Sequence, residues 1–212
     1  CTQPAGFLAD ATDCDDADAT VNPAGTEVLC NGKDDDCDGG PDSGIIYEEN
    51  FDDGSANNWS MSSNNGSVNW HVDSYRKHSQ PYSLAMNNAA THSYNYGAVD
   101  GTAVSQSVPL PTVAGGTIKL NWRLDAHTDP AEYCSGNDNY DVLRVQVNSN
   151  TVWQKCADQL EQVPSWQNQE IDLSAYAGQS VQTKFRFYTS DSLYNSGEGL
   201  YIDDFNITVK CN

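Results

Sequence analysis

The segment "TIKLNWRLDA", residues 117–126, alternates apolar and polar side chains without a break. Ile118, Leu120, Trp122 and Leu124 fall on one side of this alternation, and charged or amide side chains fall on the other. A period of two over this length is typical of a β-strand with one buried face, because successive strand side chains point to opposite sides. The feature therefore predicts a sheet packed against a core.

The same texture continues from about residue 45 to the end of the chain. "DVLRVQVN" and "VQTKFRFY" repeat the alternation, and shorter candidate strands are residues 45–51, 67–73, 82–87, 103–110, 151–155, 168–173 and 199–209. Gly, Asn, Ser and Pro separate these segments, and no convincing amphipathic helix lies between them. We therefore predict an all-β domain over residues 44–212, an antiparallel β-sandwich of the jelly-roll kind.

The first 43 residues have a different composition. Residues 1–44 hold eleven acids against one base, Lys33, together with four of the seven cysteines and few large apolar residues. Such a segment cannot fold by hydrophobic burial alone, so it needs disulfides, a metal ion, or both. We predict a separate loop-rich segment over residues 1–43.

Charge and cysteine content restrict the partners and the compartment. The net charge of −20 argues against binding to nucleic acid or to anionic membranes, and no apolar run approaches the roughly 18 residues of a membrane span. Seven cysteines favour an oxidising, extracellular or cell-surface location, and their odd number implies a free thiol or a partner outside the chain. Because the chain begins at Cys1, it is interpreted as a mature product or a fragment of a larger secreted polypeptide.

The stretch "GKDDDCDGGPD", residues 32–42, has the spacing of a calcium loop. Asp34, Asp36 and Asp38 are followed by Gly39, and alternate aspartates on a tight turn can direct several oxygens at one ion. An EF-hand would require Glu at loop position twelve, which is Ile45 here, so that motif is excluded.

Further acids in this segment are candidate ligands as well. They are Asp42, at loop position nine, and a cluster made of Asp10, Asp13, Asp15, Asp16 and Asp18. A solvated acidic linker is the alternative, but the interleaved cysteines argue against it. Ligands that are all oxygen favour Ca²⁺ over zinc or copper.

The run "CTQPAGFLADATDCDDADATVNPAGTEVLCNGKDDDCDGGPD" resembles the Asp/Cys-rich metal-binding repeat of secreted bacterial proteins, the MopE type. The resemblance rests on D-C-D-D-x-D, on the N-P-x-x-x-E turn and on C-N-G-x-D-D-D-C-D-G. It implies a modular metal-holding segment, but it does not imply copper, because the four histidines all lie outside the repeat. We expect disulfides Cys1–Cys14 and Cys30–Cys37 here and Cys134–Cys156 in the sandwich, although spacing alone does not establish such pairings.

Three carboxylates of the sandwich share a strand face with apolar residues: Glu49, Asp141 and Asp203. A buried carboxylate must be paired, neutralised or coordinated, and few cations are present. We expect a Ca²⁺ ion, shared between the first and last strands, to coordinate these carboxylates, with Asp52, Asp138 and Asp204 as secondary ligands. The alternative is exposure at a strand end, or a β-bulge that turns the acids outward.

Residues 44–210 resemble the MAM-type jelly rolls, with the cleaved-adhesin or choice-of-anchor class as the nearest group. "EENFDDGSANNW", "NDNYDVLRV" and "GLYIDDFNIT" carry this resemblance. It implies a domain appended to bacterial proteases and adhesins, with structural Ca²⁺ near these elements.

No catalytic motif is recognisable, so the chain is not expected to be an enzyme. H-E-x-x-H and G-x-S-x-G are both absent from the sequence. We expect a calcium-binding attachment or recognition module of a secreted bacterial hydrolase, in particular a protease, or of an adhesin, with an extracellular protein or glycan as its ligand. One alternative is a carbohydrate-binding module that uses Tyr94 and Tyr96 in "THSYNYG". The other is metal sequestration, with copper as the metal.

Overall fold

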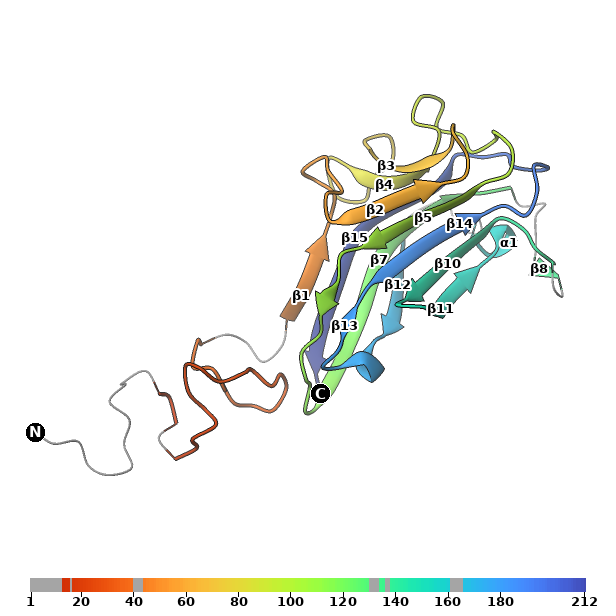
Figure 1. Cartoon of the computed structure of the whole chain (residues 1–212). Coiled ribbons are helices and arrows are strands. Elements are labelled where there is room, and N and C mark those ends of the chain that lie inside the picture. The colour runs from red at the N-terminus through yellow and green to blue at the C-terminus, as the bar shows by residue number, and fades with distance from the viewer. Residues whose placement is uncertain (1–12, 16, 40–43, 130–133, 136–137, 161–165) are drawn as a thin grey trace, which may run out of the picture.

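The structure, a computed structural model, describes residues 13–15, 17–39, 44–129, 134–135, 138–160 and 166–212, with the backbone alone at 134–135 and 138–139. Two antiparallel sheets face each other in the larger part of the chain, and a loop-rich segment extends from one end of them (Figure 1). The C-terminus lies at that same end. The predicted all-β jelly-roll sandwich, preceded by a disulfide-containing segment, is confirmed.

The larger sheet has six strands, in the order β12-β7-β15-β4-β3, with β1 paired to β15. Its strands are β1 (Gly44–Glu49), β3 (Asn69–Asp73), β4 (Ser83–Asn87), β7 (Gly116–His127), β12 (Gln167–Asp172) and β15 (Gly199–Cys211). The long strands β7 and β15 pair over most of their length and form the centre of the molecule.

The smaller sheet has five strands, in the order β11-β10-β14-β5-β2. Its strands are β2 (Trp59–Ser63), β5 (Asp100–Ser105), β10 (Val142–Val147), β11 (Asn150–Lys155) and β14 (Thr183–Tyr188). Minor elements are the pairs β6 (Val108–Pro109) with β13 (Ser180–Val181) and β8 (Cys134–Ser135) with β9 (Asp138–Asn139), the short helix α1 (Ala157–Leu160) and the 3₁₀ turn η1 (Ser174–Tyr176). Within the described residues, no helix is long and apolar enough to cross a membrane.

Aromatic rings from both sheets fill the space between them. Trp59 and Phe185 of the five-stranded sheet stack with centroids 5.8 Å apart. From the six-stranded sheet, Phe205 meets Trp59 edge-on at 5.1 Å and Trp122 meets Phe185 at 5.6 Å. Because these rings are fully or nearly fully buried, they hold the two sheets in one packed core.

Candidate functional site

Three carboxylates of the N-terminal segment converge on one point. One oxygen each of Glu27, Asp34 and Asp36 lie within 4.8 Å of one another, and all three residues are half-buried. Asp34 and Asp36 come from the predicted calcium loop, whereas Glu27 lies seven residues upstream of Asp34. Oxygen atoms at this separation match the first shell of a hard divalent cation.

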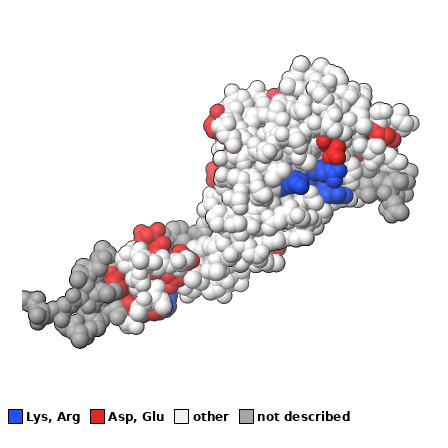
Figure 2. All heavy atoms as spheres, viewed as in Figure 1, with Lys and Arg blue, Asp and Glu red and all other residues white. Residues whose placement is uncertain are grey.

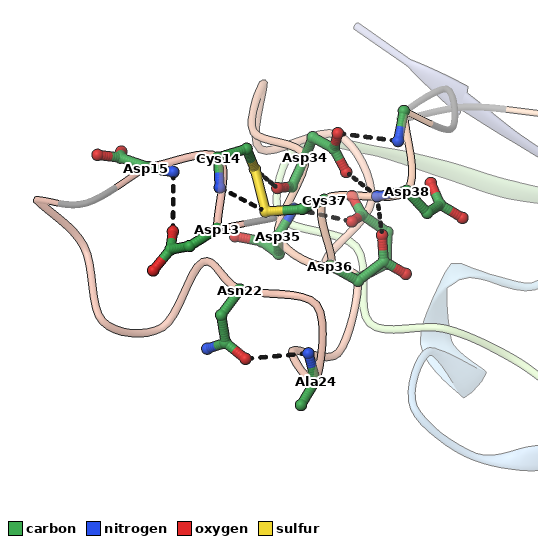
Figure 3. The surroundings of a disulfide bond; sticks show 12 residues. Asp13, Cys14, Asp15, Asn22, Ala24, Asp34, Asp35, Asp36, Cys37 and Asp38 are labelled. Atoms are coloured by element: carbon green, nitrogen blue, oxygen red, sulfur yellow. Dashed lines mark hydrogen bonds between the residues drawn. A yellow bond between two sulfur atoms is a disulfide. The ribbon is translucent and has the colours of Figure 1, made fainter. Parts of the chain in front are cut away.

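Backbone N–H groups orient the two aspartates of this cluster (Figure 3). Asp34 accepts hydrogen bonds from the N–H of Asp38 at 3.1 Å and from the N–H of Gly39 at 3.0 Å. Asp36 also accepts from the Asp38 N–H, at 3.2 Å. Gly39 has φ +74°, a conformation that L side chains rarely adopt, so the turn that aims these oxygens depends on glycine.

Asp35, between the two, has a structural role instead. Its carboxylate is buried and accepts from the Val28 N–H at 3.1 Å and from the Asn31 amide at 2.6 Å. Its own N–H donates to Glu27 at 2.9 Å. These bonds fold the Glu27 stretch back over the aspartate loop and bring the third carboxylate to the other two.

Among the described residues, no cationic side chain pairs with Glu27, Asp34 or Asp36. Partial burial raises the pKa of Glu27 above its usual value, and the charges of Asp35 and Asp36 add to this effect, although backbone N–H groups oppose it. A cation bound between carboxylates crowded in this way stabilises their ionised forms, because it reduces the repulsion between them. The donor set, carboxylate oxygens alone, fits Ca²⁺ better than a soft metal.

Two disulfides hold this loop and connect it to the sandwich. Cys14–Cys37 closes the aspartate loop from within the segment. Cys30–Cys211 ties the segment to the end of β15, and next to it Leu29 forms a parallel bridge with Val113. A Cβ on Gly116 would lie 2.7 Å from the Cys30 sulfur, so a residue without a side chain is needed for this approach.

These pairings correct the expected ones. Cys14 pairs with Cys37 rather than with Cys1, and Cys30 pairs with Cys211 rather than with Cys37. Cys211, left without a partner by the sequence reasoning, thus belongs to the junction. Cys1 lies outside the described residues. Cys156 is disulfide-bonded, but the Cys134 side chain is not among those described, so the pairing Cys134–Cys156 stays a prediction.

The other predicted acids of this segment that the structure describes are not members of the three-carboxylate group. Asp13 and Asp15 accept from the N–H groups two residues ahead, as in Asx turns. Asp18 bonds Lys33 at 2.5 Å, and this ammonium holds the pKa of Asp18 well below its usual range. Asp38 is exposed and contributes its N–H. Asp10, Asp16 and Asp42 lie outside the described residues.

A β-bulge changes the position expected for Asp203. The pairing of β15 with β7 shifts register between Asp203 and Asn206, and Asp204 has φ +48°. Before the bulge Asp203 lies opposite Arg123, whose side of β7 faces away from the core, and after it Ile207 lies opposite the core residue Leu120. Asp203 is therefore on the outer face and does not share a face with Ile207.

Asp203 is nevertheless fully buried, beneath the loop that precedes β4. It accepts from the N–H groups of His78 (2.7 Å), Ser79 (3.1 Å) and Asp204 (2.8 Å), and from the Ser79 hydroxyl (3.3 Å). Burial raises its pKa to about 6 in spite of these donors. Donor groups of the protein thus occupy the oxygens expected to bind calcium.

Asp141 and Glu49, the other two carboxylates expected to point inward, have surroundings separate from those of Asp203. Asp141 is buried and accepts from the Tyr94 hydroxyl at 2.6 Å. Glu49 accepts from the Phe51 N–H at 3.1 Å, and burial raises its pKa. Among the described residues, Glu49, Asp141 and Asp203 do not form a group close enough to share an ion, contrary to expectation.

Asp52 and Asp204, two of the secondary ligands expected in the sandwich, have separate surroundings. One oxygen of Asp52 is buried without a hydrogen-bond partner in the described structure. Asp204 contacts His78, with its carboxylate 2.5 Å from the ring Nδ1. The Asp138 side chain lies outside those described.

The two tyrosines expected to bind sugar, Tyr94 and Tyr96, differ in their exposure to solvent. Tyr94 is fully buried, its hydroxyl bonds Asp141 and the Asp129 N–H, and its ring packs edge-on against Phe187, so Tyr94 belongs to the core. Tyr96 is 42% exposed and bonds Thr91 through its hydroxyl. Only Tyr96 is available to a ligand, so a paired stacking surface is absent here.

Charge is distributed unevenly over the surface (Figure 2). Acidic side chains gather on the N-terminal segment, whereas basic side chains gather on the face of the sandwich turned toward the viewer. The outward residues of the five-stranded sheet there include Arg144, Lys184 and Arg186, and Asp100 pairs with Arg186 at 2.7 Å. The negative net charge is therefore not shared by this sheet.

Sequence comparison matches the N-terminal segment to one family. Residues 13–43 match the model of the family described as "Putative metal-binding motif". Bacillopeptidase F of Bacillus subtilis (strain 168) is 38% identical over 58 residues, which make up 27% of this chain and 4% of that protein. The chain thus spans a small fraction of the length of this curated relative.

Solved structures resemble this chain at low sequence identity. TmCBM61, solved in complex with beta-1,4-galactotriose, has a TM-score of 0.48 at 14% identity, over 74% of this chain and 92% of that one. The K1 cleaved adhesin domain of Lys-gingipain from Porphyromonas gingivalis W83 has a TM-score of 0.45 at 13% identity, over 78% and 98%. The CBM22-1 xylan-binding domain from Paenibacillus barcinonensis Xyn10C has a TM-score of 0.45 at 14% identity, over 79% of this chain and 96% of that one.

The metal-binding repeat recognised in the sequence is thus confirmed for residues 13–43, and a cleaved adhesin domain is among the structural neighbours. Glu27 is the candidate ligand that the sequence reasoning missed. A signal for it was present, because the N-P-x-x-x-E turn that identified the repeat ends at this residue.

Proposed function

We propose that this chain is a non-catalytic recognition module of a larger secreted bacterial protein, with an N-terminal segment that is closed by Ca²⁺. The observation that carries the proposal is the convergence of Glu27, Asp34 and Asp36 in a segment disulfide-bonded to the sandwich. A metal held there would fix the segment at one end of the domain, where chain from the rest of a larger protein would enter.

The chemistry of the cluster supports calcium over copper. Cys14 and Cys37 are oxidised to a disulfide, so neither offers a thiolate to a soft metal. The four histidines lie in the sandwich, where each ring contacts a carboxylate: His71 and His92 with Asp73, His78 with Asp204, and His127 with Asp125. Copper sequestration by the segment therefore lacks suitable ligands among the described residues.

The surroundings of the acids support a role without catalysis. Asp203 has a pKa near neutrality, but its oxygens accept four hydrogen bonds beneath a covering loop, so it is not open to a substrate. The disulfides fit an oxidising compartment. The match to part of bacillopeptidase F supports attachment to a protease in particular.

Calcium titration of matched variants tests the metal centre. Glu27→Gln and Asp34→Asn should each weaken calcium binding at least tenfold in isothermal titration, because each removes a carboxylate from the cluster. Asp13→Asn makes the same charge change in the same segment while keeping the oxygen that accepts from Asp15, so it should bind calcium as the wild type does.

Two results would contradict the proposal. One is equal loss of calcium binding in Asp13→Asn and Glu27→Gln, which would indicate diffuse charge rather than a site. The other is tight copper binding that persists in excess calcium, which would favour the sequestration alternative.

A further inference from the structure

The bulge in β15 lies beside a hollow on the outer face of the six-stranded sheet. A cavity of about 380 Å³ opens there, lined by residues of β7, β12 and β15 and by the end of β1 with the residue that follows. Its walls are polar throughout: four asparagines (Asn50, Asn121, Asn168 and Asn206), Arg123, and the acids Glu48 and Asp204. The volume lies in the range of small-ligand sites, roughly 300–1,000 Å³, but such sites are usually lined by apolar side chains.

Strand register places these side chains on one surface. Asn168 lies opposite Arg123 across β12 and β7, Asn121 lies opposite Asn206 across β7 and β15, and Asn206 lies opposite Glu48 of β1. Directly opposed residues of antiparallel strands point to the same face. Because the alternate residues of β7 enter the core, the row lies on the outer surface of four adjacent strands.

Arg123 differs from the other arginines of the chain. Arg76 pairs with Glu198, Arg186 pairs with Asp100, and Arg144 bonds Gln154 and Tyr188. The Arg123 guanidinium has no hydrogen bond or ion pair in the described part of the chain, although acids outnumber bases threefold in the sequence. A half-buried guanidinium with its five donors unused is available to a ligand.

The amides beside it are only partly used. Asn121 donates to Asn206 at 3.2 Å, and Asn206 donates to the Asp204 carbonyl at 3.1 Å. The Asn168 side chain has no hydrogen-bond partner among the residues described. The wall of the cavity therefore offers both donors and acceptors.

An aromatic ring lies just before β12, one contact away from the cavity wall. Trp166 precedes Asn168 by two residues, and its ring meets the His78 ring edge-on at 6.0 Å. His78 contacts Asp204, which lines the cavity. The indole is therefore connected to the polar wall through His78.

We propose that this cavity binds a neutral saccharide unit of a glycan, with Arg123 and Asn168 as its principal contacts and Trp166 as a further contact beside the wall. A sugar hydroxyl both donates and accepts, which suits a wall of amides, and the guanidinium fork can donate to two adjacent hydroxyl oxygens. The apolar face of a sugar ring can pack on the indole. The inference rests on the recognition role proposed above. It specifies the class of ligand and the position of the binding site.

The lining argues against other ligand classes. An apolar ligand would leave the amides and the guanidinium without hydrogen-bond partners, which is unfavourable for each of these groups that the ligand buries. A polyanion would meet Glu48 and Asp204 beside the single cation. The basic face of the opposite sheet, around Arg144 and Arg186, is a better place for an anionic glycan, and the experiment separates the two faces.

Calorimetric titration with β-1,4-linked tetrasaccharides of glucose, xylose, mannose, galactose and N-acetylglucosamine tests the proposal. At least one should bind at micromolar to millimolar concentration, and Arg123→Gln and Asn168→Ala should each weaken that binding about tenfold, since each removes a hydrogen-bonding group. Trp166→Ala should weaken it as well. Arg123 and Asn168 have no protein partner to lose, so urea unfolding of both variants should match the wild type.

Arg144→Gln is the matched control, because it removes the same charge from the outer face of the other sheet. It should bind the tetrasaccharide as the wild type does. The proposal is overturned if no tetrasaccharide binds, or if Arg144→Gln loses binding that Arg123→Gln retains. Calcium titration of the same samples reports separately on the metal centre, so failure of one proposal is distinguishable from failure of the other.

Discussion

Removal of the disulfide Cys30–Cys211 should weaken the whole sandwich. The two cysteines are separated by 181 residues, so the bond restrains nearly the entire unfolded chain. The chain-entropy relation for a loop of this length gives a stabilisation of about 5 kcal/mol at 25 °C. The double substitution Cys30→Ser with Cys211→Ser, which leaves no free thiol at the junction, should lower the free energy of unfolding by up to that amount.

The second disulfide provides the internal comparison. Cys14 and Cys37 are 23 residues apart, and the same relation gives about 3 kcal/mol. Both cysteines lie in the N-terminal segment, away from the aromatic core. Removal of this disulfide should therefore destabilise the segment rather than the sandwich. Cys14→Ser with Cys37→Ser should therefore weaken calcium binding and leave unfolding of the sandwich nearly unchanged.

Tryptophan fluorescence during urea unfolding separates the two effects, since all five tryptophans lie in the sandwich. Peptide mapping without reduction should first recover the Cys30–Cys211 pair. The urea midpoint should then fall in the Cys30 and Cys211 double variant only. An unchanged midpoint in that variant would refute the entropic reasoning. Equal falls in both double variants would show that segment and sandwich unfold as one unit.

Two further buried groups lead to expectations of their own. Because the folded pKa of Asp203 is raised to about 6 from 3.8, its contribution to stability is greatest at low pH and is lost as the pH rises through 6. The unfolding free energy of the wild type minus that of Asp203→Ala should thus increase by up to about 3 kcal/mol from pH 7 to pH 4, and a difference independent of pH would contradict this. Tyr94→Phe should cost about 2–4 kcal/mol in urea unfolding, because it leaves Asp141 and the Asp129 N–H without the hydroxyl. Tyr96→Ala, at an exposed position, should cost less than about 0.5 kcal/mol.

Most strands were predictable because their apolar residues alternate. The segment 117–126 became β7, which begins and ends within one residue of that range, and the 82–87, 151–155 and 168–173 candidates lie within one residue of β4, β11 and β12. The strand β2 was missed. It has only two apolar residues, Trp59 and Met61, set among serines, and so its strand state depends on pairing with β5.

The position of Asp203 shows where a rule based on alternation fails. Parity along "YIDDFNITV" places this aspartate with Phe205, but the bulge at Asp204 adds one residue to β15 and exchanges the two faces. The bulge that turns the acid outward was one of the alternatives open from the sequence. Pairing with β7 decides between them, and a single strand does not contain that information.

The sequence alone determined the composition of each part: alternating strands that must pack into a sandwich, and an acidic, cysteine-rich segment that must be closed by covalent bonds or a metal. These properties follow from local spacing, because alternation and turn chemistry act over a few residues. Only the tertiary structure decided that Glu27 joins Asp34 and Asp36, that Cys30 finds Cys211, and that four strands bring their asparagines to one hollow. Each of these depends on chain segments distant in sequence becoming neighbours, which the packing of the two sheets and the register of their strands control.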